Sequence, residues 1–136
     1  MNRVTLCKVF VRDQDEALDF YTRKLGFEVA EDNKLGDYRW LLVRLPDNHE
    51  FSLNLDVAKS EEQKALVGCH AADLPLFSIE TDDCMRDYRA MKARGVEFEG
   101  EPRGTTLRHR RSPERSLRQQ DLLEPGLRPE DDSRRE

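Results

Sequence analysis

From Glu101 to its end, this 136-residue chain contains no aromatic residue, no valine, no isoleucine and no lysine. The same stretch holds nine arginines and eight acidic residues, so it cannot bury enough apolar surface to offset the entropy lost on ordering. All ten aromatic residues lie between Phe10 and Phe98. We therefore expect one globular domain before Glu101 and an irregular or disordered tail over 104–136.

Cysteine is scarce, and long apolar runs and an excess of positive charge are missing. The three cysteines, Cys7, Cys69 and Cys84, are spaced like neither a disulfide framework nor a zinc site, and we interpret them as buried structural thiols. No apolar run is long enough to span a membrane, and the N-terminus has no signal-peptide pattern. The net charge of −5 argues against nucleic acid as a partner. These absences predict a cytoplasmic protein that binds neither a membrane nor nucleic acid.

The first 57 residues show one helical pattern and four strand patterns. Residues 6–11 alternate as a half-buried strand does. Asp13 is placed to cap a helix, and Gly26 stands where a left-handed C-terminal cap belongs. Three further strands are expected over 27–32, 38–45 and 50–57, with a turn over 33–37 between the first two. The predicted order is β-α-β-β-β.

The same pattern begins again after a connector that carries a short helix capped by Ser60. A strand over 74–81 is followed by a helix that Asp82 opens and Gly95 closes, and then by a strand over 96–100. Because both cap and stop recur after 69 residues, we interpret the chain as two copies of one module. The expected organisation is a first module over 1–57, a connector over 58–73, an incomplete second module over 74–103 and a tail over 104–136.

Three segments, VFVRDQDEALDFYTRKLGFEV, RWLLV and GVEFEGEP, resemble the vicinal oxygen chelate superfamily. That superfamily contains glyoxalase I, extradiol dioxygenases and bleomycin-resistance proteins, and the resemblance covers Thr5 to Pro102. It implies an α+β fold of paired β-α-β-β-β modules, the glyoxalase-like fold, whose sheets curl around a cavity. Here the second module would lack its last two strands. The resemblance also implies a homodimer, since members are commonly dimers.

The resemblance further implies where a metal would be held. Metal-using members place four His, Glu or Gln ligands on strand positions that face the cavity. The first would fall on Leu6 and the third on Leu76, whose side chains cannot bind a divalent cation. The second falls near Glu50 or Ser52, and the fourth belongs to a missing strand. We therefore expect no metal site and no cofactor, and we interpret His49 and His70, in expected loops, as surface residues.

The tail can also be interpreted as a segment translated in the wrong frame. Read one base later, one possible coding sequence for Leu107 to Gly126 gives Tyr-Gly-Thr-Gly, a variable stretch, and Asp-Leu-Tyr-Gly-Asn-Lys-Ile-Tyr-Leu-Asn-Gln. This resembles a C-terminus of the family. The hypothesis is a frameshift between Pro102 and Leu107, and the alternative is a native disordered tail. Any helix in the tail is expected within Pro113–Leu123.

Alternation along the strands selects candidate ligand-binding residues. If Cys7, Val9 and Val11 pack on the helices, the residues between them face the cavity. The side of the third strand that faces inward stays open, although Trp40 would suit stacking on a flat ligand. The candidates are Lys8, Phe10, Trp40, Glu50, Ser52 and Asn54. Glu50 is the one plausible general base, and no catalytic residue is assigned.

Three functions remain open at this point. We favour metal-free binding of a small apolar or aromatic molecule in a sheet-lined cavity, in the manner of antibiotic-sequestering members of the family. The first alternative is a metal-dependent lyase or dioxygenase of the same superfamily. The second is an inactive truncated product, because open sheet edges of the incomplete module invite pairing with another chain.

Overall fold

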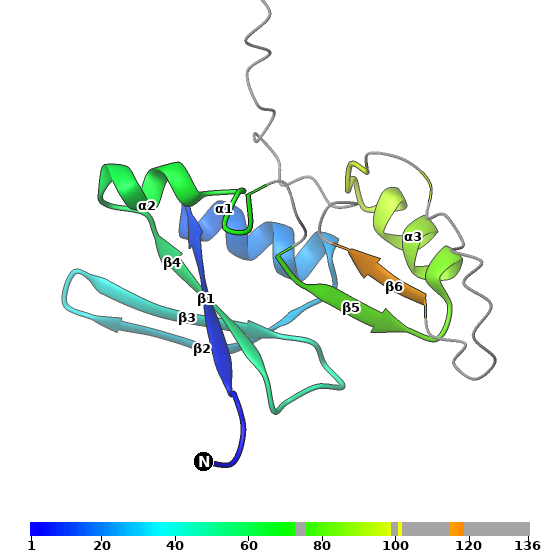
Figure 1. Cartoon of the computed structure of the whole chain (residues 1–136), viewed down its shortest axis with the longest axis horizontal. Helices are drawn as coiled ribbons and strands as arrows, with labels where there is room; N and C mark the ends of the chain where they lie inside the picture. Colours follow the sequence, from blue (N-terminus) through cyan, green and yellow to red (C-terminus); the bar gives the residue numbers. More distant parts are fainter. Residues whose placement is uncertain (73–75, 99–100, 102–114, 119–136) are drawn as a thin grey trace, which may run out of the picture. The chain divides into compact units, whose positions relative to one another are not determined.

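The structure is a computed structural model that describes residues 1–72, 76–98 and 101, and the backbone of 115–118. The chain divides into two compact units, Met1–Asp73 and Leu74–Glu136 (Figure 1). In the described part of the chain, no helix is long and apolar enough to cross a membrane.

The first unit is a four-stranded sheet with helices, and it matches the predicted order of elements. Its sheet has the strand order β1-β4-β3-β2, in which β1 and β4 are parallel and the other pairs antiparallel. The elements in chain order are β1 (Leu6–Val11), α1 (Gln14–Asp19), the π-helical turn η1 (Phe20–Lys24), β2 (Glu28–Leu35), β3 (Tyr38–Arg44), β4 (Ser52–Val57) and α2 (Glu61–Leu66). The first module is therefore β-α-β-β-β, followed by the helical connector.

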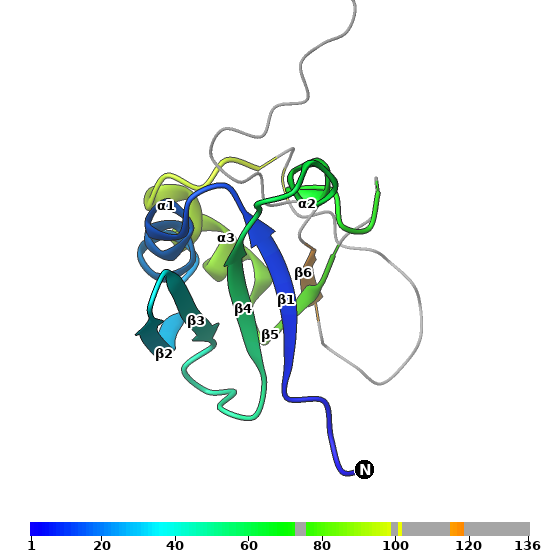
Figure 2. The same cartoon turned by 90° about the vertical axis from the view of Figure 1, so that its left-hand side faces the viewer.

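One face of this sheet packs against α1 and forms the core of the unit (Figure 2). The predicted alternation is confirmed here, because Val9, Val11 and Leu55 on this face are each at most 2% exposed. Gln14 joins the helix to the strands, since its Nε2 donates to the carbonyl oxygens of Leu55 at 2.8 Å and of Arg39 at 3.2 Å. The opposite face of the sheet is thereby left for other contacts.

The first helix begins and ends where the sequence predicts. The Asp13 carboxylate accepts from the Glu16 N–H at 2.8 Å, and Gly26 has a φ of 88°, in the left-handed region that glycine tolerates. Thirteen positions separate Asp13 from Gly26, whereas twelve separate the corresponding Asp83 from Gly95. The additional residue is accommodated by η1, because a π-helical turn holds one residue more than an α-helical turn.

The expected turn over 33–37 is wrong in length. β2 continues to Leu35, which pairs with Tyr38, so only Gly36 and Asp37 form the turn. Gly36 has a φ of 63°, and this conformation permits a two-residue hairpin turn. The fourth strand also begins later than expected, at Ser52 rather than residue 50. The connector helix is confirmed, with Ser60 and Gln63 forming a capping box.

The second unit contains β5 (Ser78–Thr81), α3 (Cys84–Ala93) and β6 (Arg115–Arg118). The predicted N-cap is wrong by one residue, because the Asp83 carboxylate, not that of Asp82, accepts from the Arg86 N–H at 3.0 Å. Gly95 ends the helix as predicted, with a φ of 92°. Of the strand expected over 96–100, the described residues 96–98 contain an isolated β-bridge at Glu97, and the remainder lies outside them.

The strand β6 corrects the prediction of a tail that is irregular throughout or helical over Pro113–Leu123. It pairs with β5 in antiparallel orientation, Ile79 opposite Leu117. In the first module, by contrast, β1 pairs with β4 in parallel. β6 therefore differs in direction from the last strand of a complete module. The presence of a strand in this segment nevertheless counts against the frameshift hypothesis. The rest of the tail lies outside the described residues.

Candidate functional site

The second face of the first sheet gathers most of the candidate residues. Leu6 lies opposite Ser52, Lys8 opposite Asn54 and Phe10 opposite Asp56, and residues paired in this way share a face. Leu42 of β3 pairs with Asn54, so the hairpin extends the same face. We call this surface the polar face, made up of Leu6, Lys8, Phe10, Trp40, Leu42, Ser52, Asn54 and Asp56.

The structure resolves on which side of β3 Trp40 lies. Arg39, its neighbour, reaches to the helix side, where its Nη1 contacts Asp15 of α1 at 2.6 Å. Trp40 therefore points to the polar face, two residues from Leu42. Its indole Nε1 donates to Glu31 of β2 at 2.8 Å, which holds the ring at the sheet. The register of β3 and β4 thus places the Trp40 ring on the same face as Asn54. An aromatic ring on a face with polar side chains can stack on a flat ligand.

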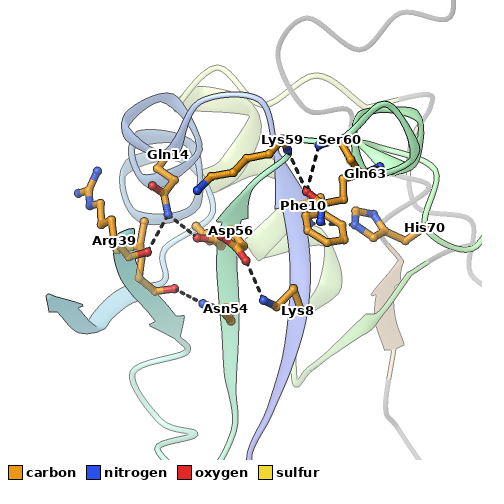
Figure 3. Close-up of polar contacts among 12 residues, drawn as sticks. Lys8, Phe10, Gln14, Arg39, Asn54, Asp56, Lys59, Ser60, Gln63 and His70 are labelled. Carbon is orange, nitrogen blue, oxygen red and sulfur yellow. Dashed lines mark hydrogen bonds and ion pairs between the residues drawn. The ribbon is translucent and has the colours of Figure 1, made fainter. Parts of the chain in front are cut away.

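Lys8 and Asp56 form a cross-strand ion pair on the polar face (Figure 3). Lys8 Nζ lies 2.7 Å from Asp56 Oδ2, and the Asp56 side chain is 13% exposed against 46% for Lys8. The hydrogen bond to Asp56 raises the pKa of Lys8, so the lysine stays charged. Sequence reasoning named Lys8 and missed Asp56, although the alternation of Ser52 and Asn54 extends to it.

Asn54 is the most deeply buried polar residue of this face. It is 1% exposed, and its Nδ2 donates to the backbone oxygen of Leu41 at 3.2 Å. Its Oδ1 has no hydrogen-bond partner within the described residues. Ser52, also buried, lies on the same strand two residues earlier.

Glu50 is the predicted candidate that the structure does not bring to the polar face. It precedes β4, its side chain is 74% exposed, and its carboxylate pairs with Arg3 at 2.9 Å. Glu50 therefore lies apart from the other candidate residues, and its carboxylate is engaged by Arg3.

The positions implied for metal ligands do not fit a cation. Leu6, where the family's first ligand would fall, lies directly opposite Ser52, one of the two positions for the second. An alkyl group and a hydroxyl do not supply the nitrogen, thiolate or carboxylate ligands that transition metals prefer. Among residues 1–72, 76–98 and 101, no three His, Cys, Asp or Glu side chains gather into a possible metal site.

His70 corrects the interpretation of both loop histidines as surface residues. His49 is exposed and lies 3.0 Å from Glu28, but His70 is half-buried. His70 Nε2 accepts from the backbone N–H of Phe10 at 2.9 Å, and the two rings stack at 6.0 Å with an angle of 8° (Figure 3). Within the described residues β1 is an edge strand of its sheet, and the connector satisfies one of its N–H groups and holds Phe10 in place. No sequence pattern signals this contact.

The His70 contact predicts a loss of stability in acid. Burial lowers the pKa of His70 below its usual 6.5, because the charged ring loses its hydration there. Only the neutral ring has an Nε2 lone pair that can accept from the Phe10 N–H. Its contribution is present above that value and is lost as the pH falls through the folded-state pKa. We expect the melting temperature of the protein to fall more between pH 7.5 and pH 4.5 than that of His70→Gln, which keeps an acceptor but does not titrate. Parallel pH profiles of the two proteins would contradict this role.

The cysteines are only partly as predicted. Cys84 is buried and Cys7 half-buried, and burial raises the pKa of the Cys7 thiol, which keeps it protonated and unreactive. Cys69 is exposed, which corrects its assignment as a buried thiol, and its Sγ donates to the Ala65 carbonyl at 2.8 Å.

Comparisons with known proteins agree with this architecture. Residues 2–114 match the family described as Glyoxalase/Bleomycin resistance protein/Dioxygenase superfamily. The protein YurT of Bacillus subtilis (strain 168) is 34% identical over 105 residues, which cover 74% of this chain and 80% of YurT.

Two solved structures show the same fold. The crystal structure of UcmS2 is 28% identical, with a TM-score of 0.69, and the match covers 79% of this chain and 85% of UcmS2. TnmS3, an antibiotic binding protein from Streptomyces sp. CB03234, is 30% identical, with a TM-score of 0.63 over 78% of this chain and 80% of TnmS3. The chain therefore belongs to the Glyoxalase/Bleomycin resistance protein/Dioxygenase superfamily.

Proposed function

We propose that this protein binds a small apolar or aromatic molecule on the polar face without the help of a metal ion. The observation that carries the proposal is the register of β1 and β4, which sets Leu6 against Ser52 where metal-using relatives would need two ligands. The same face offers Phe10 and Trp40, two half-buried aromatic rings, beside the buried polar groups. Aromatic surface with a few fixed polar groups is the usual composition of a small-molecule site.

The similarity to TnmS3 supports the binding of a small molecule, but it does not identify that molecule. TnmS3 is an antibiotic binding protein and shares this fold at 30% identity. Because this chain shares that fold, the small molecule that we propose it binds includes antibiotics as a class. The partners we propose are a small-molecule ligand and a second copy of the chain.

Titration with Zn²⁺, Ni²⁺, Mn²⁺ and Fe²⁺ tests the metal-free part of the proposal. We expect each metal to leave the melting temperature unchanged within about 1 °C, because Leu6 and Ser52 do not supply metal ligands. A metal that did bind the folded state, at a hundred times its Kd, would add about 2.7 kcal/mol and shift the transition by several degrees. The measurement is thermal unfolding at pH 7.5 with and without a chelator. A shift of several degrees that the chelator reverses would instead favour the metal-dependent lyase or dioxygenase.

A further inference from the structure

Asn54 of β4 has an unusual combination of burial and missing contacts. Its side chain is 1% exposed, yet Oδ1 has no hydrogen-bond partner within the described residues. A buried acceptor without a donor costs folding free energy, and native proteins rarely keep one without a use. A hydrogen bond from a donor outside the described chain to this oxygen would therefore stabilise the complex without breaking an existing bond.

The orientation of the Asn54 amide follows from its other contact. Nδ2 lies 3.2 Å from the Leu41 carbonyl oxygen, which can only accept a hydrogen bond. Turning the amide over would set two acceptors against each other and lose this bond. The oxygen is consequently the end of the amide that stays without a partner.

Two side-chain donors of the polar face, those of Lys8 and Trp40, are engaged elsewhere. Lys8 lies directly opposite Asn54 in the ladder, but its Nζ is 2.7 Å from Asp56. The Trp40 indole N–H, from the adjacent strand, is given to Glu31 at 2.8 Å. Figure 3 shows Lys8 directed at Asp56, and not at Asn54. Neither of these donors therefore reaches Asn54 Oδ1, which has no hydrogen-bond partner within the described residues.

The charges of the site also restrict the ligand. Lys8 is neutralised by Asp56, and Arg44, farther along β3, is paired with Glu28 at 2.9 Å. A carboxylate or phosphate ligand would have to break one of these pairs to find a cation. An uncharged ligand meets the face without that cost.

We propose that Asn54 selects ligands that carry an uncharged N–H or O–H donor on a flat or apolar body, such as a phenol, an indole or a secondary amide. The donor bonds to Asn54 Oδ1 and the body lies on the aromatic surface of the polar face. The inference rests on the proposed binding function and adds the chemical class of the ligand.

Matched pairs of probes that differ only in the donor test this selection. The pairs are 2-naphthol with 2-methoxynaphthalene and indole with 1-methylindole, titrated into the full chain by isothermal calorimetry. We expect the donor member of each pair to bind about tenfold or more tightly, because a buried polar group left unpaired penalises the methylated analogue. In spectra of ¹⁵N-labelled protein, the side-chain amide signal of Asn54 should shift with the donor member.

Replacing the acceptor should remove the preference. Asn54→Leu is expected to bind both members of a pair at the strength of the methylated one, whereas Asn48→Leu, the same change in an exposed turn, should keep the preference. If Asn54→Leu does not fold, the affinities of the wild-type protein for the donor and methylated members of each pair decide whether Asn54 selects the donor. Equal binding of both members by the wild type would overturn the role of Asn54 and leave the proposed function standing. If no probe binds up to its solubility, the proposed function itself fails.

Discussion

Leu55→Ala is expected to destabilise the first module by about 2–5 kcal/mol, the usual cost of emptying a fully buried leucine site. Leu55 is 0% exposed at the centre of β4, on the face that α1 covers, and Gln14 bonds to its carbonyl. The substitution removes the apolar contact and leaves a cavity that the rigid sheet cannot close. Urea unfolding followed by the fluorescence of Trp40, the single tryptophan, measures the loss.

Leu35→Ala is the matched control for this prediction. It deletes the same atoms from a leucine that is 68% exposed beside the β2–β3 turn. Its expected effect is at most about 0.5 kcal/mol, as for other surface substitutions. Equal losses at the two sites would mean that the α1 face of the sheet is not the core.

A chain rebuilt in the alternative reading frame after Pro102 is expected to be more stable than the present one, because it gains a burial term of about 5–8 kcal/mol against which the entropy of ordering the new strands is set. Phe77, Ile79 and Phe98 are only half-buried in the second unit. Two further strands would cover roughly 200–300 Å² of apolar surface, at about 25 cal/mol for each Å². The gain is comparable with the whole stability of a small domain, and calorimetric unfolding of the two chains measures it.

The coding DNA decides whether this rebuilt chain is the ancestral one. Read one base later from about codon 98, it should stay open and encode Asp-Leu-Tyr-Gly-Asn. Stop codons in that frame would refute the frameshift and make the tail native. A chain ended after Pro102 is the control, because it separates loss of the present tail, including β6, from gain of the new strands.

Local chemistry made much of the first module predictable. The capping carboxylate of Asp13, the glycine at 26 and the alternation of residues 6–11 each act through near neighbours, and each is confirmed. The second helix shows the limit of such reasoning, since an aspartate stands at both 82 and 83 and only the backbone decides which one caps. A repeat of 69 residues pointed to Asp82, but η1 adds one residue to the first helix and shifts the correspondence.

The sequence by itself determined the family, the module order and the two-sided pattern of β1 and β4, because these depend on residue type and spacing along one strand or helix. Only the tertiary structure decided which strands are neighbours and in what register. That register joined Lys8 to Asp56, turned Trp40 to the polar face and left Glu50 outside it. The path of the connector brought His70 to Phe10 from 60 residues away. Contacts of this kind join segments far apart in the chain, so they depend on how whole elements pack and not on any local pattern.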